Sequence, residues 1–121
     1  AEERVLAALP KALVIRTAAF FSPFDAYNFA IWVERELRQG RAVHAAEGFV
    51  VTPTFVPDLV HASLDLLIDE AQGIWHLTNQ EPVSWFDFGR RVAETMDLDP
   101  RLVRPARPDQ LGWRARRPAY V

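Results

Sequence analysis

The chain has 121 residues, 50% of them hydrophobic and 25% charged, with a formal net charge of −2. This composition is typical of one packed domain and predicts no nucleic-acid partner, because binding a polyanion calls for a net basic surface. The absence of Cys excludes disulfides, thiolate metal sites and Cys nucleophiles. A membrane span needs about 20 apolar residues, and no apolar run comes near that length, so we expect a cytoplasmic protein with no membrane partner.

Residues 2–9 predict a helix, and the uninterrupted apolar run at residues 12–15 predicts the strand that follows it. An apolar run without alternation is typical of a central parallel strand with both faces covered. A buried helix segment is the alternative, but Pro10 and Pro23 on either side of the run favour the strand. Polarity changes at Arg16-Thr17, where the strand reaches its carboxyl end, and open α/β sheets bind ligands at that edge.

The next helix is predicted over residues 28–38, after an irregular connection at residues 20–27. Asn28 is a good N-cap, and Gly40 is a typical stop just beyond the helix end. The apolar stripe of this helix, at spacing i, i+3, i+4 and i+8, consists of Phe29, Trp32, Val33 and Leu37.

The middle of the chain predicts a strand, a turn and a second strand over residues 42–51. Pro53 and Pro57 then exclude a helix interior at residues 52–57. Pro57 suits the first turn of the helix that follows, and Asp58 beside it is expected to cap that helix. The apolar face of the helix consists of Val60, Leu64, Leu67 and Ile68.

Residues 73–79 predict a buried strand that ends in polar residues. Ser84 and Asp87 form an S-x-x-D capping box that opens the last helix, and residues 102–105 predict a last short strand. Because strands and helices alternate along the chain, we expect an α/β or α+β fold held by one core.

The residue chemistry alone predicts no complete active site. The three His lie in different segments without metal-ligand spacing, so we expect no metal. A triad of Ser63, His61 and Asp58 lacks the G-x-S-x-G turn that presents such a nucleophile. The sequence has no Gly-rich dinucleotide loop and no Walker loop, so it predicts no phosphate site of that kind.

A set of stretches nevertheless keeps a recognisable order and spacing along nearly the whole chain. It consists of ALVIRT at residues 12–17 followed by aromatics, Asn28-Phe29, Thr52-Pro53-Thr54-Phe55-Val56-Pro57-Asp58-Leu59, Gly73-Ile74-Trp75-His76-Leu77, Val83-Ser84-Trp85 and Arg117-Pro118. Together these stretches are similar to the dTDP-4-dehydrorhamnose reductases and resemble the wider group of extended short-chain dehydrogenase/reductases that act on sugar nucleotides.

The resemblance implies an α/β fold, the C-terminal part of an extended Rossmann-type reductase. Residues 1–121 would form its last sheet strand or strands and its small mixed α/β substrate-binding subdomain. The family's chemistry is hydride transfer from NADPH or NADH to a 4-keto-deoxysugar carried on a nucleoside diphosphate. The Gly-rich loop and the catalytic Tyr-x-x-x-Lys pair would precede Ala1, so we expect a fragment that carries no catalytic residue and is inactive alone.

The resemblance also implies a set of ligand-binding residues. Those expected beside the nicotinamide cofactor, NADP or NAD, are Thr17 and Ala18. Those expected to bind the nucleoside-diphosphate sugar are Ala19, Asn28, Phe29, Thr52, Pro53, Thr54 and Arg117. The residues themselves leave plainer roles open, namely an N-cap for Asn28, a solvated arginine for Arg117, and loop shaping for residues 52–54.

The sequence departs from the family pattern at a few positions. Ala19 stands where many of the reductases carry an aromatic, and Gly48-Phe49 stands where Asp-Gln is usual. These departures keep a second function open, a non-catalytic sugar-nucleotide-binding or regulatory module, for instance fused to another enzyme. Because a fragment without its first sheet strands has unpaired strand edges, we also expect a homodimer or a swapped assembly.

Overall fold

The computed structural model describes residues 1–79 and 81–111. Its helices are α1 (Glu2–Ala8), α2 (Phe29–Arg38), α3 (Val56–Ile68) and α4 (Trp85–Thr95), with short 3-10 turns at Pro100–Leu102 and Pro108–Gln110. Its strands are β1 (Leu13–Arg16), β2 (Phe20–Phe21), β3 (Val43–Ala46), β4 (Val50–Val51), β5 (Thr54–Phe55), β6 (Gly73–His76), β7 (Val83–Ser84) and β8 (Val103–Ala106).

The strands join in pairs between segments far apart in the chain. β1 pairs with β6, β2 with β5, and β3 with β8, all in parallel, whereas β4 and β7 run antiparallel. Each parallel pair needs a long crossover connection, and the helices supply it. The predicted α/β alternation is therefore confirmed.

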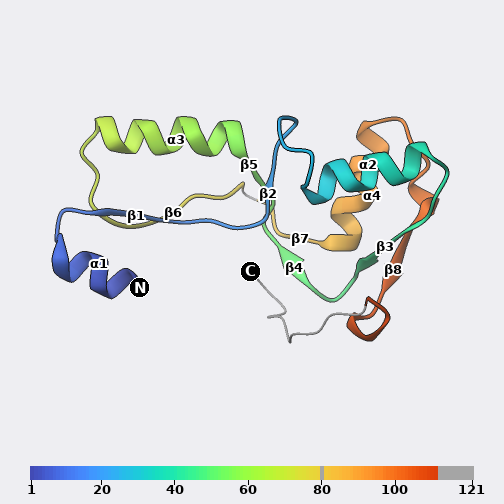
Figure 1. Ribbon diagram of the computed structural model, residues 1–121, viewed down its shortest axis with the longest axis horizontal. Coiled ribbons are helices and arrows are strands. Elements are labelled where there is room, and N and C mark those ends of the chain that lie inside the picture. Colours follow the sequence, from blue (N-terminus) through green and yellow to red (C-terminus); the bar gives the residue numbers. More distant parts are fainter. Residues whose placement is uncertain (80, 112–121) are drawn as a thin grey trace.

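The elements form two lobes, joined through the short β2–β5 and β4–β7 pairs (Figure 1). One lobe, which we call the sheet lobe, contains α1, β1, β6 and α3, with α3 above and α1 below the β1–β6 pair in this view. The other, which we call the core lobe, contains α2, β3, α4 and β8. The carboxyl end of β1 points from the sheet lobe towards the junction.

The hydrophobic core lies in the core lobe. Its buried residues come from both helices and both strands of that lobe: Val33, Leu37, Val43, Ala93 and Val103. Gly89 brings α4 close to β8, since a Cβ at this position would lie 3.0 Å from Cγ1 of Val103. The predicted stripe of α2 is thus confirmed at Val33 and Leu37, which are 0% and 5% exposed.

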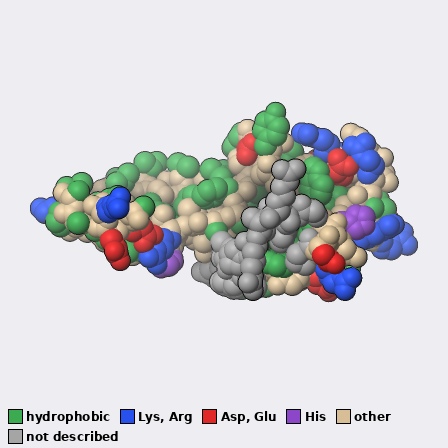
Figure 2. Space-filling view, turned by 60° about the horizontal axis from the view of Figure 1, so that its bottom comes forward, with side chains coloured by type: hydrophobic (Ala, Val, Ile, Leu, Met, Phe, Trp, Pro, Cys, Tyr) green, Lys and Arg blue, Asp and Glu red, His purple; other side chains and the backbone are tan. Residues whose placement is uncertain are grey.

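The sheet lobe is much less buried than the sequence predicts. Neither α1 nor α3 contains a buried residue, and the apolar face of α3 is open to solvent, with Leu64 51% and Ile68 77% exposed. Figure 2 shows hydrophobic side chains at the surface of this lobe, in the left half of the view. The two predicted strands are confirmed as β1 and β6, but the prediction that they are fully buried is wrong for this chain, because Leu13–Ile15 are half-buried and Ile74–His76 are exposed.

Local signals at the helix ends give the expected geometry in most places. The Ser84 hydroxyl accepts a hydrogen bond from the Asp87 backbone N–H at 3.0 Å, which confirms Ser84 as the N-cap of α4. Gly40 follows α2 with φ of +74°, as a left-handed stop should. The expected cap at Asp58 is wrong: within residues 1–79 and 81–111 its side chain makes no capping hydrogen bond, and α3 begins at Val56 with Phe55 as its N-cap.

Among the described residues no helix is long and apolar enough to cross a membrane. The same part of the chain contains no group of three or more His, Asp or Glu that could hold a metal ion.

Candidate functional site

The carboxyl end of β1 meets the segment before α3. The backbone N–H of Thr54 donates to the carbonyl of Ala19 at 2.9 Å, and β2 then pairs with β5. Thr54 is 2% exposed, and its hydroxyl donates to the carbonyl of Thr52 at 3.3 Å. The structure therefore brings residues 17–19 and residues 52–54 together, two groups that the resemblance assigns to one site.

Two features of this junction cost folding free energy. The Thr17 hydroxyl oxygen is buried and has no hydrogen-bond partner among the described residues. Ala19 has φ of +52°, a left-handed conformation that is uncommon for a residue with a Cβ. Ala18, between them, is half-buried. A buried hydroxyl without a partner costs about 1–3 kcal/mol, which a ligand atom placed there would offset.

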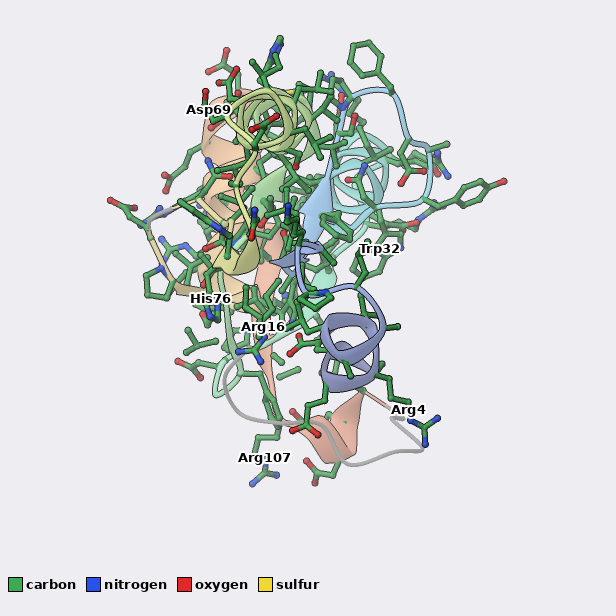
Figure 3. All side chains as sticks on the ribbon, turned by 90° about the vertical axis from the view of Figure 1, so that its left-hand side faces the viewer. Arg4, Arg16, Trp32, Asp69, His76 and Arg107 are labelled. Carbon is green, nitrogen blue, oxygen red and sulfur yellow. The ribbon has the colours of Figure 1, made fainter. Side chains whose placement is uncertain are left out.

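An ion pair ties α1 to the same end of β1. The Arg16 guanidinium donates to both carboxylate oxygens of Glu2, with Nε 2.8 Å from Oε1. This hydrogen bonding lowers the pKa of Glu2 below its ordinary value and raises the pKa of Arg16. His76 occupies the position paired with Arg16 on β6 (Figure 3). Both partners of the ion pair are solvent-accessible, so its contribution to stability is small.

The Asn28 side chain is fully engaged within its own loop. Its amide Nδ2 donates to the carbonyls of Ser22 at 2.8 Å and Asp25 at 3.0 Å. Its Oδ1 accepts from the backbone N–H of Ile31 at 3.0 Å, so the N-cap role is confirmed. What the start of α2 offers to an anion is therefore its free backbone N–H groups and helix dipole, rather than the Asn28 side chain.

Phe29 is the central ring of an aromatic cluster. Its ring centroid lies 4.9 Å from that of Trp85, 5.4 Å from that of Phe88 and 5.9 Å from that of Trp32. These separations are within the range of favourable aromatic pairs, so Phe29 packs α2 against the start of α4. The Phe29 side chain therefore packs two helices together, a role that could not be told apart from ligand binding by its sequence pattern.

Beside this cluster lies a cavity of about 320 Å³, which we call the aromatic pocket. Its lining residues come from α2, β3, α4 and the segment after β8: Phe29, Trp32, His44, Ala45, Ala46, Trp85 and Leu111. Sequence reasoning missed all of these except Phe29. Trp32 was assigned to the buried stripe of α2 by its spacing, but the structure leaves it 42% exposed.

Two further cavities lie near the same segments. A groove of about 570 Å³ between α2 and α4 includes Pro53 in its lining, and a cavity of about 520 Å³ at the start of α3 includes Thr54. The groove is mostly apolar but has Glu34, Glu81 and Arg91 in its lining, and Arg91 already pairs with Glu81 at 2.8 Å. Arg117, the remaining residue of the predicted site, lies outside the described residues.

The chain matches the RmlD substrate binding domain family over residues 1–121. It is 35% identical over 121 residues to a dTDP-4-dehydrorhamnose reductase of Mycolicibacterium smegmatis, a match that covers 99% of this chain and 37% of that protein. This chain therefore spans well under half the length of that relative.

Solved structures give the same picture. A dTDP-4-dehydrorhamnose reductase from Clostridium acetobutylicum aligns with a TM-score of 0.84 at 26% identity, covering 98% of this chain and 41% of the other. A dTDP-4-dehydrorhamnose reductase from Bacillus anthracis, solved in complex with NADP, aligns with a TM-score of 0.81 at 23% identity, covering 89% and 38%. The expected fold class, the C-terminal part of such a reductase, is confirmed.

Proposed function

Because the chain belongs to the RmlD substrate binding domain family, we propose that it is the substrate-binding part of an NAD(P)-dependent sugar-nucleotide reductase. Its substrate would be a nucleoside-diphosphate 4-keto-deoxysugar, and the names of its relatives favour a dTDP-sugar. The protein would be located in the cytoplasm, where such biosynthetic substrates are made. The intact protein would act with the catalytic Tyr and Lys supplied outside these 121 residues, and these residues alone would bind without turnover.

The observation that carries this proposal is the unpartnered Thr17 hydroxyl at the carboxyl end of β1. A buried hydroxyl both donates and accepts, which suits the carboxamide of a nicotinamide ring. Thr17 and Ala18 would therefore hold the nicotinamide end of NADP or NAD. When bound, that cofactor supplies the hydride.

The other residues of the site would position the substrate. Ala19 and residues 52–54 share one junction, where the Thr54 N–H donates to the Ala19 carbonyl, and they would contact the sugar ring there. The free backbone N–H groups at the start of α2, near Phe29, would bind the diphosphate, since a helix N-terminus favours an anion. Arg117 would add a bidentate contact to the same phosphates.

The experiment measures two affinities on the intact protein by calorimetry, one for NADPH and one for dTDP. We expect Thr17→Val to weaken NADPH binding and to leave dTDP binding unchanged, because only the cofactor would contact the hydroxyl. Thr95→Val, at the far end of α4, is the matched control and should change neither. If wild-type protein binds dTDP but does not bind NADPH, the result would support the non-catalytic module instead. The small side chain at Ala19 also favours that second function. Protein that binds neither would refute both functions.

A further inference from the structure

We infer that Asn79 is a positioning residue for the proposed reaction, which holds the sugar-contacting segment in place beside the cofactor site. The inference rests on the proposed function and adds to its site a residue from a third part of the chain. Asn79 follows β6, 24 positions after Phe55 in the sequence, and its Oδ1 accepts a hydrogen bond from the Phe55 backbone N–H at 3.0 Å. A side chain just beyond the sheet lobe therefore reaches the junction between the lobes.

This hydrogen bond occupies the open edge of β5. Successive N–H groups of a strand point to opposite edges, and the N–H of Thr54 donates to the Ala19 carbonyl on the β2 side at 2.9 Å. The next N–H, that of Phe55, points to the other edge, where no strand of the described chain pairs with β5, and Asn79 accepts it there. The Asn79 amide oxygen thus takes the place of a neighbouring strand, and β5 is held from both sides.

Open space borders this segment in two directions. Asn79 lines both the groove between α2 and α4 and the cavity at the start of α3. Pro53 and Phe55 line the groove, and Thr54 lines the cavity. The ring of Phe55 packs on Phe21 of β2, at a centroid separation of 5.3 Å, so ring packing holds the β2 side. On the opposite side the segment has room to shift, and the hydrogen bond to Asn79 restricts that shift.

The position of this segment matters because the two proposed ligands meet at it. Thr17 and Ala18 would hold the nicotinamide, and residues 52–54 would contact the sugar. The separation of these two groups of residues then sets how the hydride donor and its acceptor face each other. A misplacement of about 1 Å between reacting partners can cost about a hundredfold in rate. Asn79 therefore acts on the rate of the chemical step through Phe55, rather than on a ligand.

The test follows single turnovers of the intact protein by rapid mixing, with bound NADPH and saturating dTDP-4-dehydrorhamnose, the compound in the names of several relatives. We expect Asn79→Ala to lower the rate constant of NADPH oxidation about tenfold, with wild-type amplitude and wild-type Kd for NADPH and dTDP. A loss of folded protein would instead lower the amplitude and leave the rate constant unchanged. Asn79→Asp keeps the accepting oxygen and should restore most of the rate constant.

A second readout follows the hydrogen bond itself. In Asn79→Ala the Phe55 amide proton should exchange with deuterium faster than in wild type, since its acceptor is gone. Gln110→Ala is the matched control, because the Gln110 side-chain oxygen also accepts a backbone N–H, that of Arg107 at 2.9 Å, but lies beyond β8. This control should change neither the rate constant nor the exchange of the Phe55 amide.

The outcomes separate this inference from the proposed function. If wild type oxidises NADPH with this substrate and Asn79→Ala does so equally fast, the proposed function stands and Asn79 has no positioning role. A slower Asn79→Ala protein whose Phe55 amide exchanges at the wild-type rate would also overturn the inference, because the loss would then not come from a released β5. If wild type shows no turnover, the proposed function falls and the inference falls with it.

Discussion

Replacing Asn28 by Asp separates the two roles that its side chain plays. Asp is as good an N-cap as Asn, so its carboxylate can still accept from the Ile31 backbone N–H. It cannot donate, so the bonds to the carbonyls of Ser22 at 2.8 Å and Asp25 at 3.0 Å are lost. A carboxylate would instead face two carbonyl oxygens, and the residue is only 7% exposed.

The magnitude follows from these contacts. Each lost hydrogen bond in a site with little water costs about 1 kcal/mol, and the repulsion between carboxylate and carbonyl oxygens adds to this. We expect Asn28→Asp to lower the free energy of unfolding by about 2–3 kcal/mol. Asn28→Ala loses the cap as well and should cost about 3 kcal/mol.

Urea unfolding monitored by circular dichroism measures these differences, provided that wild type and variants share the same slope of unfolding free energy against urea concentration. Ser84→Ala is the control, because it removes the single capping bond of α4 and should cost about 1 kcal/mol. An Asn28→Asp protein as stable as wild type would refute the reasoning. It would mean that the amide donors do not hold the loop, and that the side chain is free for a ligand.

Three further predictions rest on single contacts. Gly89→Ala should lower the free energy of unfolding by about 1 kcal/mol, as measured by thermal unfolding. The added Cβ would lie 3.0 Å from buried, β-branched Val103, and the cost of this crowding should exceed the gain of about 1 kcal/mol in helix propensity. Arg16→Gln should raise the pKa of Glu2 back towards its ordinary value of 4.5, as measured by carbon NMR titration of the Glu2 carboxyl. The pKa of Glu2 is lower in the folded chain, so the ion pair stabilises above about pH 4.5, and this contribution is lost as the pH falls through the folded pKa. Thr17→Val should raise the stability of the ligand-free protein by about 1 kcal/mol, since it removes an unpartnered hydroxyl; urea unfolding measures it.

Each of these predictions has a result that would contradict it. A Gly89→Ala protein more stable than wild type would show that the gain in helix propensity outweighs any crowding against Val103. A Glu2 pKa that is the same with and without Arg16 would show that the ion pair does not form in solution. A Thr17→Val protein less stable than wild type would show that the hydroxyl has a partner.

The parts of the fold that the sequence predicts well depend on near neighbours in the chain. The caps at Asn28 and Ser84 and the left-handed stop at Gly40 each involve residues within a few positions, so their chemistry is complete in the local sequence. The order of strands and helices follows from the same short-range signals.

Burial and the aromatic pocket depend on distant residues and could not be predicted this way. The run at residues 12–15 has the composition of a fully buried strand, but α1 and α3 leave it only half-buried within the described chain. The spacing of Trp32 fits a buried stripe, and only the arrangement of α2 against β3 shows that its ring stays open. At Ala19, the resemblance predicted the contact region but could not predict the left-handed backbone.

The uneven burial of the two lobes has a consequence for how the chain opens. The sheet lobe has its strand hydrogen bonds but no buried side chain on α1 or α3, whereas β3 and β8 cross the core. Amide protons of β1 and β6 should therefore exchange with deuterium through local opening, at free energies well below that of global unfolding. Amides of β3 and β8 should exchange only when the whole domain unfolds. Slowing of exchange along β1 and β6 would then report directly when a surface has closed over the sheet lobe.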